Sequence, residues 1–383
     1  MGVRDVLRRT ALARPAVLLV PLPGATAVRL AAEAELRRRG WPRALSPAAA
    51  DLLVVAGDAR GTGGDPLGEV WRQLSWPRAR VDLPGTDGLA HRLDTAAARL
   101  TSSQVPEDDD PEDDDPDDHG LPMADRADDR DGLRLDRLHV PLGPALPDWP
   151  CGLVLRTALQ GDVVQDVEVD RLPVPAGSGS YWNGPWLRAA RGAEVTRGEA
   201  ERRRCAAHLD SLGRFLAVAG WRDAAARARR LRDSAPADGS HRAEVLRLVR
   251  RVSRSRTLRW LTAGVGPLPA ARARHLGVSG PALAGGGDVP DRVGDVHDRV
   301  RVWLDEVARA VAAFEDRTPL TAADTDGPRG RVDGPRPPSA ALLDALPELL
   351  RGAEFGAARL IVASLDPDVD ELAAVPAREV PYG

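Results

Sequence analysis

Two cysteines are the only thiols that this chain offers for metal or redox chemistry. They are Cys151 and Cys205, and they lie in unrelated parts of the sequence. An iron–sulfur cluster takes about four cysteine ligands, and a small disulfide scaffold needs several pairs. The sequence therefore predicts no metal site and no disulfide framework.

Two histidines are candidates for proton transfer. His139 precedes a proline-rich loop, and His208 falls in a helical pattern together with Glu201 and Arg204. The spacing of Glu201 and Arg204 puts both on one turn and one face of a helix, which favours an internal ion pair. One histidine near a loop and one in a helix form no catalytic constellation. We interpret the helical group as a buried helix with a satisfied histidine, and the catalytic residues stay unknown.

Other familiar ligand motifs are missing. The glycine loops at Pro23-Gly24 and 61–64 match neither a Walker nor a dinucleotide fingerprint, so ordinary turns are expected. The acidic run EDDDPEDDDPDD (Glu107–Asp118) lacks the spacing and the glycine of a calcium-binding EF-hand. Its charge and low apolar content predict a disordered linker over residues 101–131. The run contributes ten negative charges to a net charge of −4, so the rest of the chain is mildly basic. This positive excess is small and scattered, so no nucleic-acid partner is expected.

Patterned sequence on either side of this linker predicts two domains, 1–100 and 132–383. In the first, short apolar runs alternate with helical segments, which is typical of a parallel sheet with right-handed crossovers. In the second, LVLRTAL and VVQDVEV flank a glycine turn, and amphipathic helices follow. The predicted fold is an α/β N-terminal parallel-sheet domain and a mainly α (α+β) C-terminal domain that starts with a β-hairpin.

The second region resembles the quinone-side large subunit of respiratory complex I, whose family is homologous to the large subunit of nickel–iron hydrogenases. The resemblance covers about residues 139–372. Its motifs are the loop HVPLGPALPDWPCG and hairpin, the Glu201/Arg204/His208 helix, HLGVSGP from His275, GDVHDR with Asp295, Asp298 and Arg299, GPRG at Gly327–Gly330, and the closing segment Leu346–Leu372. The motif residues of the two helices are expected to be structural.

The first region resembles another complex I protein, the one that carries the terminal iron–sulfur cluster and is kin to the hydrogenase small subunit. The matching stretches are SPAAADLLVVAGD and WPRARVDLPG. That family holds its cluster with cysteines on two loops. The corresponding loops here, Pro21–Thr26 and Pro84–Gly88, contain no cysteine. The resemblance therefore implies a degenerate domain that has lost its cluster, and the four thiolates of a nickel–iron centre are absent as well.

The resemblance of the second region also implies where a quinone would bind. The family's proton donors are a histidine of the proline-rich loop and a tyrosine ahead of the first long helix. Here Leu146 and either Pro150 or Cys151 replace the loop histidines, and Trp186 or Tyr181 stands near the tyrosine. Quinone is a possible ligand, although no cofactor is expected. The candidate pocket residues are His139, Leu146, Asp148, Trp149, Cys151, Tyr181 and Trp186.

These resemblances imply an accessory, cofactor-free subunit of a complex-I-like or hydrogenase-like NADH/quinone oxidoreductase membrane assembly. Its partners would be the other subunits, including antiporter-like membrane subunits that it couples or caps. We expect no signal peptide and no membrane-spanning segment, hence a cytoplasmic protein that reaches the membrane through its partners. Two alternatives stay open: an active quinone oxidoreductase that uses Tyr181 with His139 or Asp148, and a soluble scaffold.

Overall fold

A parallel sheet of three short strands organises the first part of the chain. The computed structural model describes residues 12–58, 67–101, 126–128, 134–235, 241–283 and 293–373. β1 (Val17–Pro21), β2 (Leu52–Ala56) and β3 (Ala79–Leu83) lie side by side in that order. β2 is buried along its whole length, because a central strand covered on both faces is a continuous apolar run. This is the parallel-sheet architecture that the sequence predicts.

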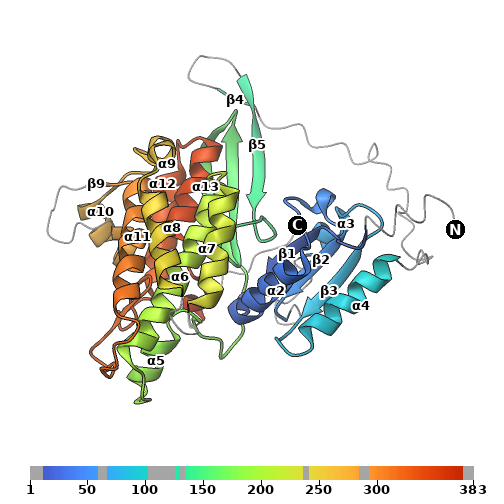
Figure 1. The fold of residues 1–383 in the computed structure, drawn as a ribbon. Helices are drawn as coiled ribbons and strands as arrows, with labels where there is room; N and C mark the ends of the chain where they lie inside the picture. Colours follow the sequence, from blue (N-terminus) through green and yellow to red (C-terminus); the bar gives the residue numbers. More distant parts are fainter. Residues whose placement is uncertain are drawn as a thin grey trace.

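Both faces of this sheet are packed. α2 (Thr26–Arg39) and α4 (Leu89–Thr101) cover one face, where Ala32 and Leu93 are fully buried. The other face packs against residues next to α3 (Gly68–Arg72) and against Leu172 from the second part of the chain. Figure 1 shows α2 on the side of the sheet that faces the helical part of the molecule. The two parts therefore share a packed boundary.

A second, antiparallel sheet opens the second part. β4 (Arg126–Asp128), β5 (Arg134–Leu142), β6 (Leu153–Gln160) and β7 (Val163–Arg171) pair in sequence order. The two segments that the sequence predicts as strands are β6 and β7, and Gly161 turns between them with a φ of 60°. β5 is not among the predicted strands, because Pro141 interrupts the alternation of Leu138, Val140 and Leu142. Pro141 is tolerated there although it gives no backbone donor to the ladder.

Helices make up most of the remainder. Among the described residues after β7, only α6 to α8 and α11 to α13 exceed ten residues. The helices after β7 are α5 (Gly184–Ala190), α6 (Arg197–Val218), α7 (Arg222–Ser234), α8 (Arg242–Ser253), α9 (Arg256–Thr262), α10 (Ala270–His275), α11 (Val296–Ala312), α12 (Pro338–Leu350) and α13 (Phe355–Leu365). Shorter elements there are the helices η4 (Gly280–Leu283) and η5 (Val369–Leu372) and the two-residue strands β8 (Leu268–Pro269), β9 (Val293–Gly294), β10 (Asp326–Gly327) and β11 (Gly330–Arg331), and the first part of the chain contains the short helix η1 (Pro47–Ala49).

The long helix α6 is the centre of this part. It packs against α7, α11 and α13, and Cys205, Leu209, Leu212 and Leu216 are buried at the helical spacing that the sequence shows. α12 packs against β7 and so joins the helices to the sheet. The predicted mainly helical second region is confirmed.

Some of the sequence predictions fall on residues that the structure does not describe. Thr101 ends α4 and Arg126–Asp128 form β4, but the rest of the expected linker lies outside the described residues, so its disorder stays a prediction. The glycine loop 61–64, for which an ordinary turn is expected, also lies outside the described residues.

Candidate functional site

The loop Gly143–Gly152 lies at the boundary between the first sheet and the helical part. The thiol of Cys151 donates to the carbonyl oxygen of Pro21, at 3.3 Å. Gly152 has a φ of +71°, and a Cβ added there would lie 2.6 Å from Cγ of Pro23. The close approach of the β1–α2 loop is therefore possible only with glycine at this position. The site is built from both parts of the chain.

Inside the loop, Trp149 is the anchor. Its indole Nε1 donates to the carbonyl oxygen of Leu153 at 2.9 Å, which satisfies the polar atom of a buried side chain. Gly143 has a φ of +91°, and a Cβ there would lie 2.2 Å from the same oxygen. Any other residue would clash with backbone at this point. The loop is thus closed tightly around the tryptophan.

Two hollows lie on either side of the loop. The one toward the boundary, lined by Leu146, Trp149 and Cys151, has a volume of about 30 Å³, enough for only a few water molecules. The one toward β5 and β6 is an open groove of about 900 Å³ with mostly apolar walls, within the ~300–1,000 Å³ of typical ligand pockets. Leu146 lines both. The loop therefore fills the boundary and leaves the groove open.

The structure brings together four of the residues proposed for a quinone pocket. Leu146, Asp148, Trp149 and Cys151 all line the small hollow. His139 lies on β5 opposite Ala158 and lines the groove instead. The seven residues predicted to share one pocket are thus divided among separate places.

Tyr181 and Trp186 line neither hollow. The ring of Tyr181 packs edge-on against Trp182 at 5.0 Å and lies under the guanidinium of Arg203 at 4.0 Å. Trp186 is buried in α5, where the guanidinium of Arg204 lies 5.1 Å from its ring. The prediction that these two residues lie next to the loop rests on alignment to a family pattern. In the structure, the chain between β7 and α5 places them away from the loop.

The thiol of Cys151 is a poor metal ligand and a poor nucleophile. Burial, followed by the negative charge of Asp370, raises its pKa well above the usual range. A thiol that stays protonated lacks the thiolate needed for either role. Within the described ranges, no group of three or more His, Cys, Asp or Glu side chains is placed to hold a metal ion.

Buried ion pairs behind the loop join α2 to α6 and α7, and sequence reasoning does not find them. We call this group the ionic joint; it consists of Arg29, Glu33, Asp210, Arg214 and Arg232. Asp210 contacts Arg29 at 2.8 Å, Arg214 at 2.9 Å and Arg232 at 2.6 Å, and Arg232 also reaches Glu33 at 2.7 Å. Burial acts to raise the pKa of Asp210, but the three guanidiniums hold it well below the usual range. The joint stays charged.

Asp148 adds a second connection across the boundary. It pairs with Arg43 of the first part at 3.0 Å and with Arg229 of α7. Its φ of 61° is unusual for a residue other than glycine. The position proposed for quinone chemistry is therefore held by arginines from both parts.

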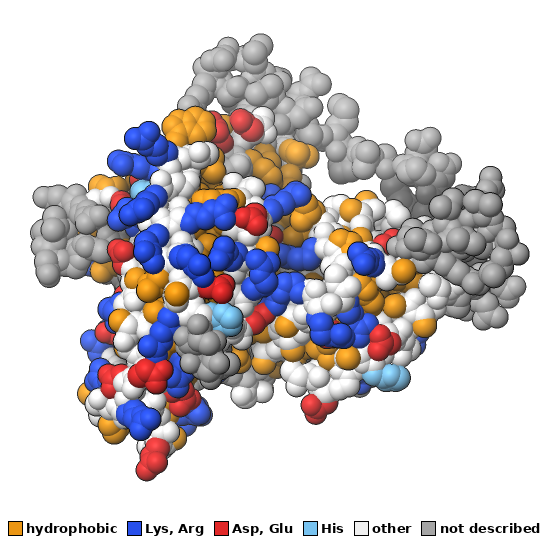
Figure 2. Space-filling model, viewed as in Figure 1, with side chains coloured by type: hydrophobic (Ala, Val, Ile, Leu, Met, Phe, Trp, Pro, Cys, Tyr) orange, Lys and Arg blue, Asp and Glu red, His pale blue; other side chains and the backbone are white. Residues whose placement is uncertain are grey.

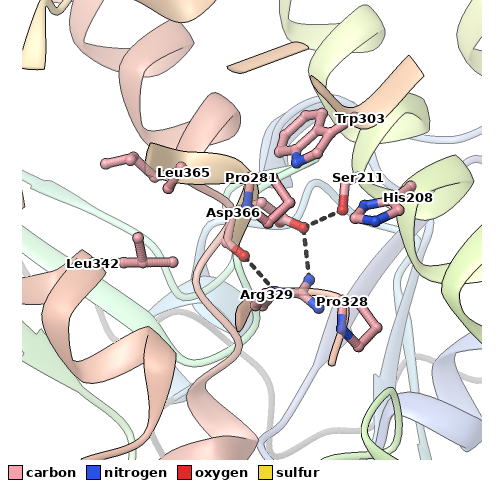
Figure 3. Close-up of a pocket in the computed structure, with 10 residues that line it drawn as sticks. His208, Ser211, Pro281, Trp303, Pro328, Arg329, Leu342, Leu365 and Asp366 are labelled. Carbon is pink, nitrogen blue, oxygen red and sulfur yellow. Dashed lines mark hydrogen bonds and ion pairs between the residues drawn. The ribbon is translucent and has the colours of Figure 1, made fainter. Parts of the chain in front are cut away.

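Arg329 of GPRG extends the charged interior toward α13. Its side chain donates to the backbone oxygen and to the carboxylate of Asp366, both at 2.7 Å, and Ser211 donates to the same carboxylate at 2.6 Å. Figure 3 shows these groups converging from α6, the loop before β11 and the end of α13. The cavity between them measures about 10 Å³, room for about one water molecule.

His208 borders this cavity. Its Nε2 is buried without a hydrogen-bond partner among the described atoms, and Glu306 lies 4.0 Å away. Burial, and then the charge of Arg204, lower the pKa of His208 well below its usual value. The ring is neutral at physiological pH, which suits a packed residue better than a proton donor.

The remaining motif residues connect helices to loops through hydrogen bonds. Arg204 reaches Glu201 at 3.2 Å, as expected from their spacing, and donates to the backbone oxygen of Gly327. Arg299 is fully buried and donates to Ser364 and to the oxygen of Gly266, each at 3.0 Å.

Asp295 begins α11 with a capping box that includes Asp298. The stretch that resembles GDxxDR thus supplies both the start of a helix and a buried structural arginine, since Arg299 follows directly. None of these contacts involves either hollow beside the loop.

Asp370 of η5 gives the boundary a pH dependence. It accepts from the amide of Gly24 at 2.6 Å and from the hydroxyl of Thr26 at 3.1 Å. Burial, and then repulsion from Asp368, raise its pKa from 3.8 to about 6. Because the folded-state pKa is raised, the stabilising protonation is complete below pH ~4 and is lost as the pH rises through about 6.

We expect Asp370→Asn to remove this dependence. Between pH 4 and pH 7 the free energy of unfolding of the variant should rise relative to the unchanged protein by about 2–3 kcal/mol, since one pKa unit is worth ~1.4 kcal/mol. Urea unfolding at a series of pH values measures the difference. Curves that stay parallel over this range would show that Asp370 does not titrate there.

No protein-family model matches the chain, and no curated protein sequence does. Among solved structures, the chain is similar to one from the membrane-bound sulfane sulfur reductase (MBS), an archaeal respiratory membrane complex. The identity is 16%, the TM-score is 0.42, and the match covers 61% of this chain and 98% of that one. At such values the likeness says nothing about chemistry or partners. No helix in the described part of this chain is both long and apolar enough to cross a bilayer.

Proposed function

We propose that this chain is an accessory subunit of a complex-I-like or hydrogenase-like membrane assembly and that it holds no iron–sulfur cluster or nickel of its own. The observation that carries the proposal is that the loop Gly143–Gly152 fills the space at the boundary between the two parts of the chain. Leu146, Trp149 and a protonated Cys151 leave a hollow of about 30 Å³, far below a typical ligand pocket of ~300 Å³ or more.

The motif residues support the same proposal. Arg204, Arg299 and Arg329 make buried contacts that fix loops to helices, so the elements that resemble the quinone-side large subunit hold the fold together. The ionic joint keeps the two parts of the chain in one arrangement. Two parts of a chain that are joined by buried ion pairs suit a protein that transmits force or caps a neighbour.

The groove beside the loop is the proposed partner surface. It has an apolar lining, and Leu45 at its edge is 54% exposed. Exposed apolar surface in a concave site marks a binding region. Antiporter-like, ion-translocating membrane subunits are the partners we propose, and this contact would keep the chain peripheral to the membrane. The groove is also large enough for an apolar ligand such as a quinone. Binding of a quinone there would not by itself mean that the chain reduces it.

A working quinone oxidoreductase is less well supported. Its proposed donor, Tyr181, packs between Trp182 and Arg203 and lines neither hollow beside the loop. His139 lines the groove, but it lies on β5 without Tyr181 beside it.

A charged substitution in the groove tests its role. With Leu45→Glu, we expect assemblies isolated in mild detergent to lose this chain, because a carboxylate would have to be buried at the contact. Retention of the chain is measured by quantitative analysis of the subunits. Leu138→Glu is the matched control, since Leu138 on β5 is 56% exposed, as Leu45 is 54% exposed, and does not line the groove. Equal retention of both variants would rule out the groove as the partner surface.

A further inference from the structure

The outer face of α8 and α9 is strongly basic. Six arginines are exposed along it, at positions 247, 250, 251, 254, 256 and 259, and Glu244 is the one acidic residue between 242 and 262. The buried faces of the same helices carry Val245, Leu248, Val252 and Leu258. Figure 2 shows the basic side chains gathered over α7 and α8. We call these six arginines the α8–α9 arginine face.

Most of this charge is not neutralised. Arg251 pairs with Asp223 at 3.1 Å, and Arg247 reaches Glu244 only at 4.0 Å. In the ranges that the structure describes, Arg254, Arg256 and Arg259 have no acidic partner. A face with this much uncompensated positive charge attracts an anionic surface.

A tryptophan projects from the same face. Trp260 is 82% exposed, and Leu261 beside it is 36% exposed. Tryptophan is enriched at membrane–water interfaces, where its ring meets the headgroup layer. Arg256 and Arg259 lie within about one turn of Trp260. The apolar ring and the cationic groups can therefore meet a headgroup layer together.

We propose that the α8–α9 arginine face docks directly on an anionic lipid bilayer. None of the three hollows described above is lined by α8 or α9. A face that lines none of these hollows and carries one projecting ring suits a broad, adaptable surface, whereas the anchor residues of a protein partner are usually held in well-packed pockets. The contact requires no membrane-spanning helix. It is also independent of the proposed partner subunits, because it concerns the isolated chain.

Vesicle co-sedimentation of the purified full chain tests this proposal. We expect binding to vesicles with about 30% phosphatidylglycerol in phosphatidylcholine, little binding to phosphatidylcholine alone, and weakening by salt. Arg256→Gln with Arg259→Gln should weaken binding about fivefold for each arginine, since one basic residue near such a surface contributes about that factor. Trp260→Ala should weaken it further.

Matched controls separate a specific face from general charge. Arg38→Gln with Arg72→Gln removes the same charge from side chains that are 69% and 74% exposed in the first part of the chain. Trp76→Ala removes a half-exposed ring there. Both should bind like the unchanged protein.

Three results would overturn the proposal. The first is equal weakening in test and control variants. The second is absence of binding both by the full chain and by a variant lacking the acidic run 107–118, which excludes masking by that run. The third is capture of the arginine face by polyglutamate but not by anionic vesicles, which would assign the face to an acidic protein instead.

Discussion

Replacing Asp210 by asparagine should lower the free energy of unfolding by about 3–5 kcal/mol, the typical cost of removing one partner from a buried ion pair. The side chain is 1% exposed and faces Arg29, Arg214 and Arg232. Asparagine is nearly the same size, so the loss arises from three guanidiniums whose shared carboxylate is gone. Urea unfolding followed by circular dichroism measures it.

Asp94→Asn is the matched control for this change. Asp94 pairs with Arg39, but its side chain is 64% exposed, and exposed pairs contribute ~0–1 kcal/mol. If both variants lose the same small amount of stability, the ionic joint does not hold the two parts together.

The second large effect is expected from Trp149→Ala, with a loss of about 3–5 kcal/mol for emptying the space of a buried aromatic ring. The loop Gly143–Gly152 closes around this ring, and the carbonyl of Leu153 would lose its indole donor. We therefore expect the boundary hollow to enlarge and the contact of Cys151 with Pro21 to loosen.

Trp76→Ala is the control here, because Trp76 is 50% exposed and its removal leaves no cavity. The measurements are urea midpoints for both variants and the rate at which Cys151 reacts with a thiol reagent. A Trp149→Ala protein as stable as the control, with Cys151 still protected, would show that the loop does not depend on the ring.

Much of the fold can be predicted from the sequence because its signals are local. β1 and β2 are apolar runs of five residues, β3 alternates apolar with charged residues, and α6 shows its buried stripe at positions 205, 209, 212 and 216. The Glu201–Arg204 pair is likewise a matter of helical spacing. β5 escapes prediction because Pro141 interrupts its alternating pattern, and pairing with β4 and β6 makes it a strand.

The site is harder to predict, because it depends on contacts between distant residues. Arg29 and Asp210 are 181 positions apart, and Arg29 does not stand out beside the many other charged residues of the chain. An aspartate within the apolar pattern of α6 is the one local signal that points to the ionic joint. Tyr181 and Trp186 are candidates for the pocket by proximity in sequence, whereas the chain after β7 places them elsewhere.

The most direct test of the central claim is isolation of the chain from its native membranes in mild detergent, followed by identification of the associated proteins and metal analysis of the separated chain. We predict that it co-purifies with membrane subunits of the antiporter-like class and that the separated chain carries neither iron nor nickel in stoichiometric amount. A chain that elutes alone, or that retains stoichiometric iron with cluster absorption after gel filtration, would contradict this claim.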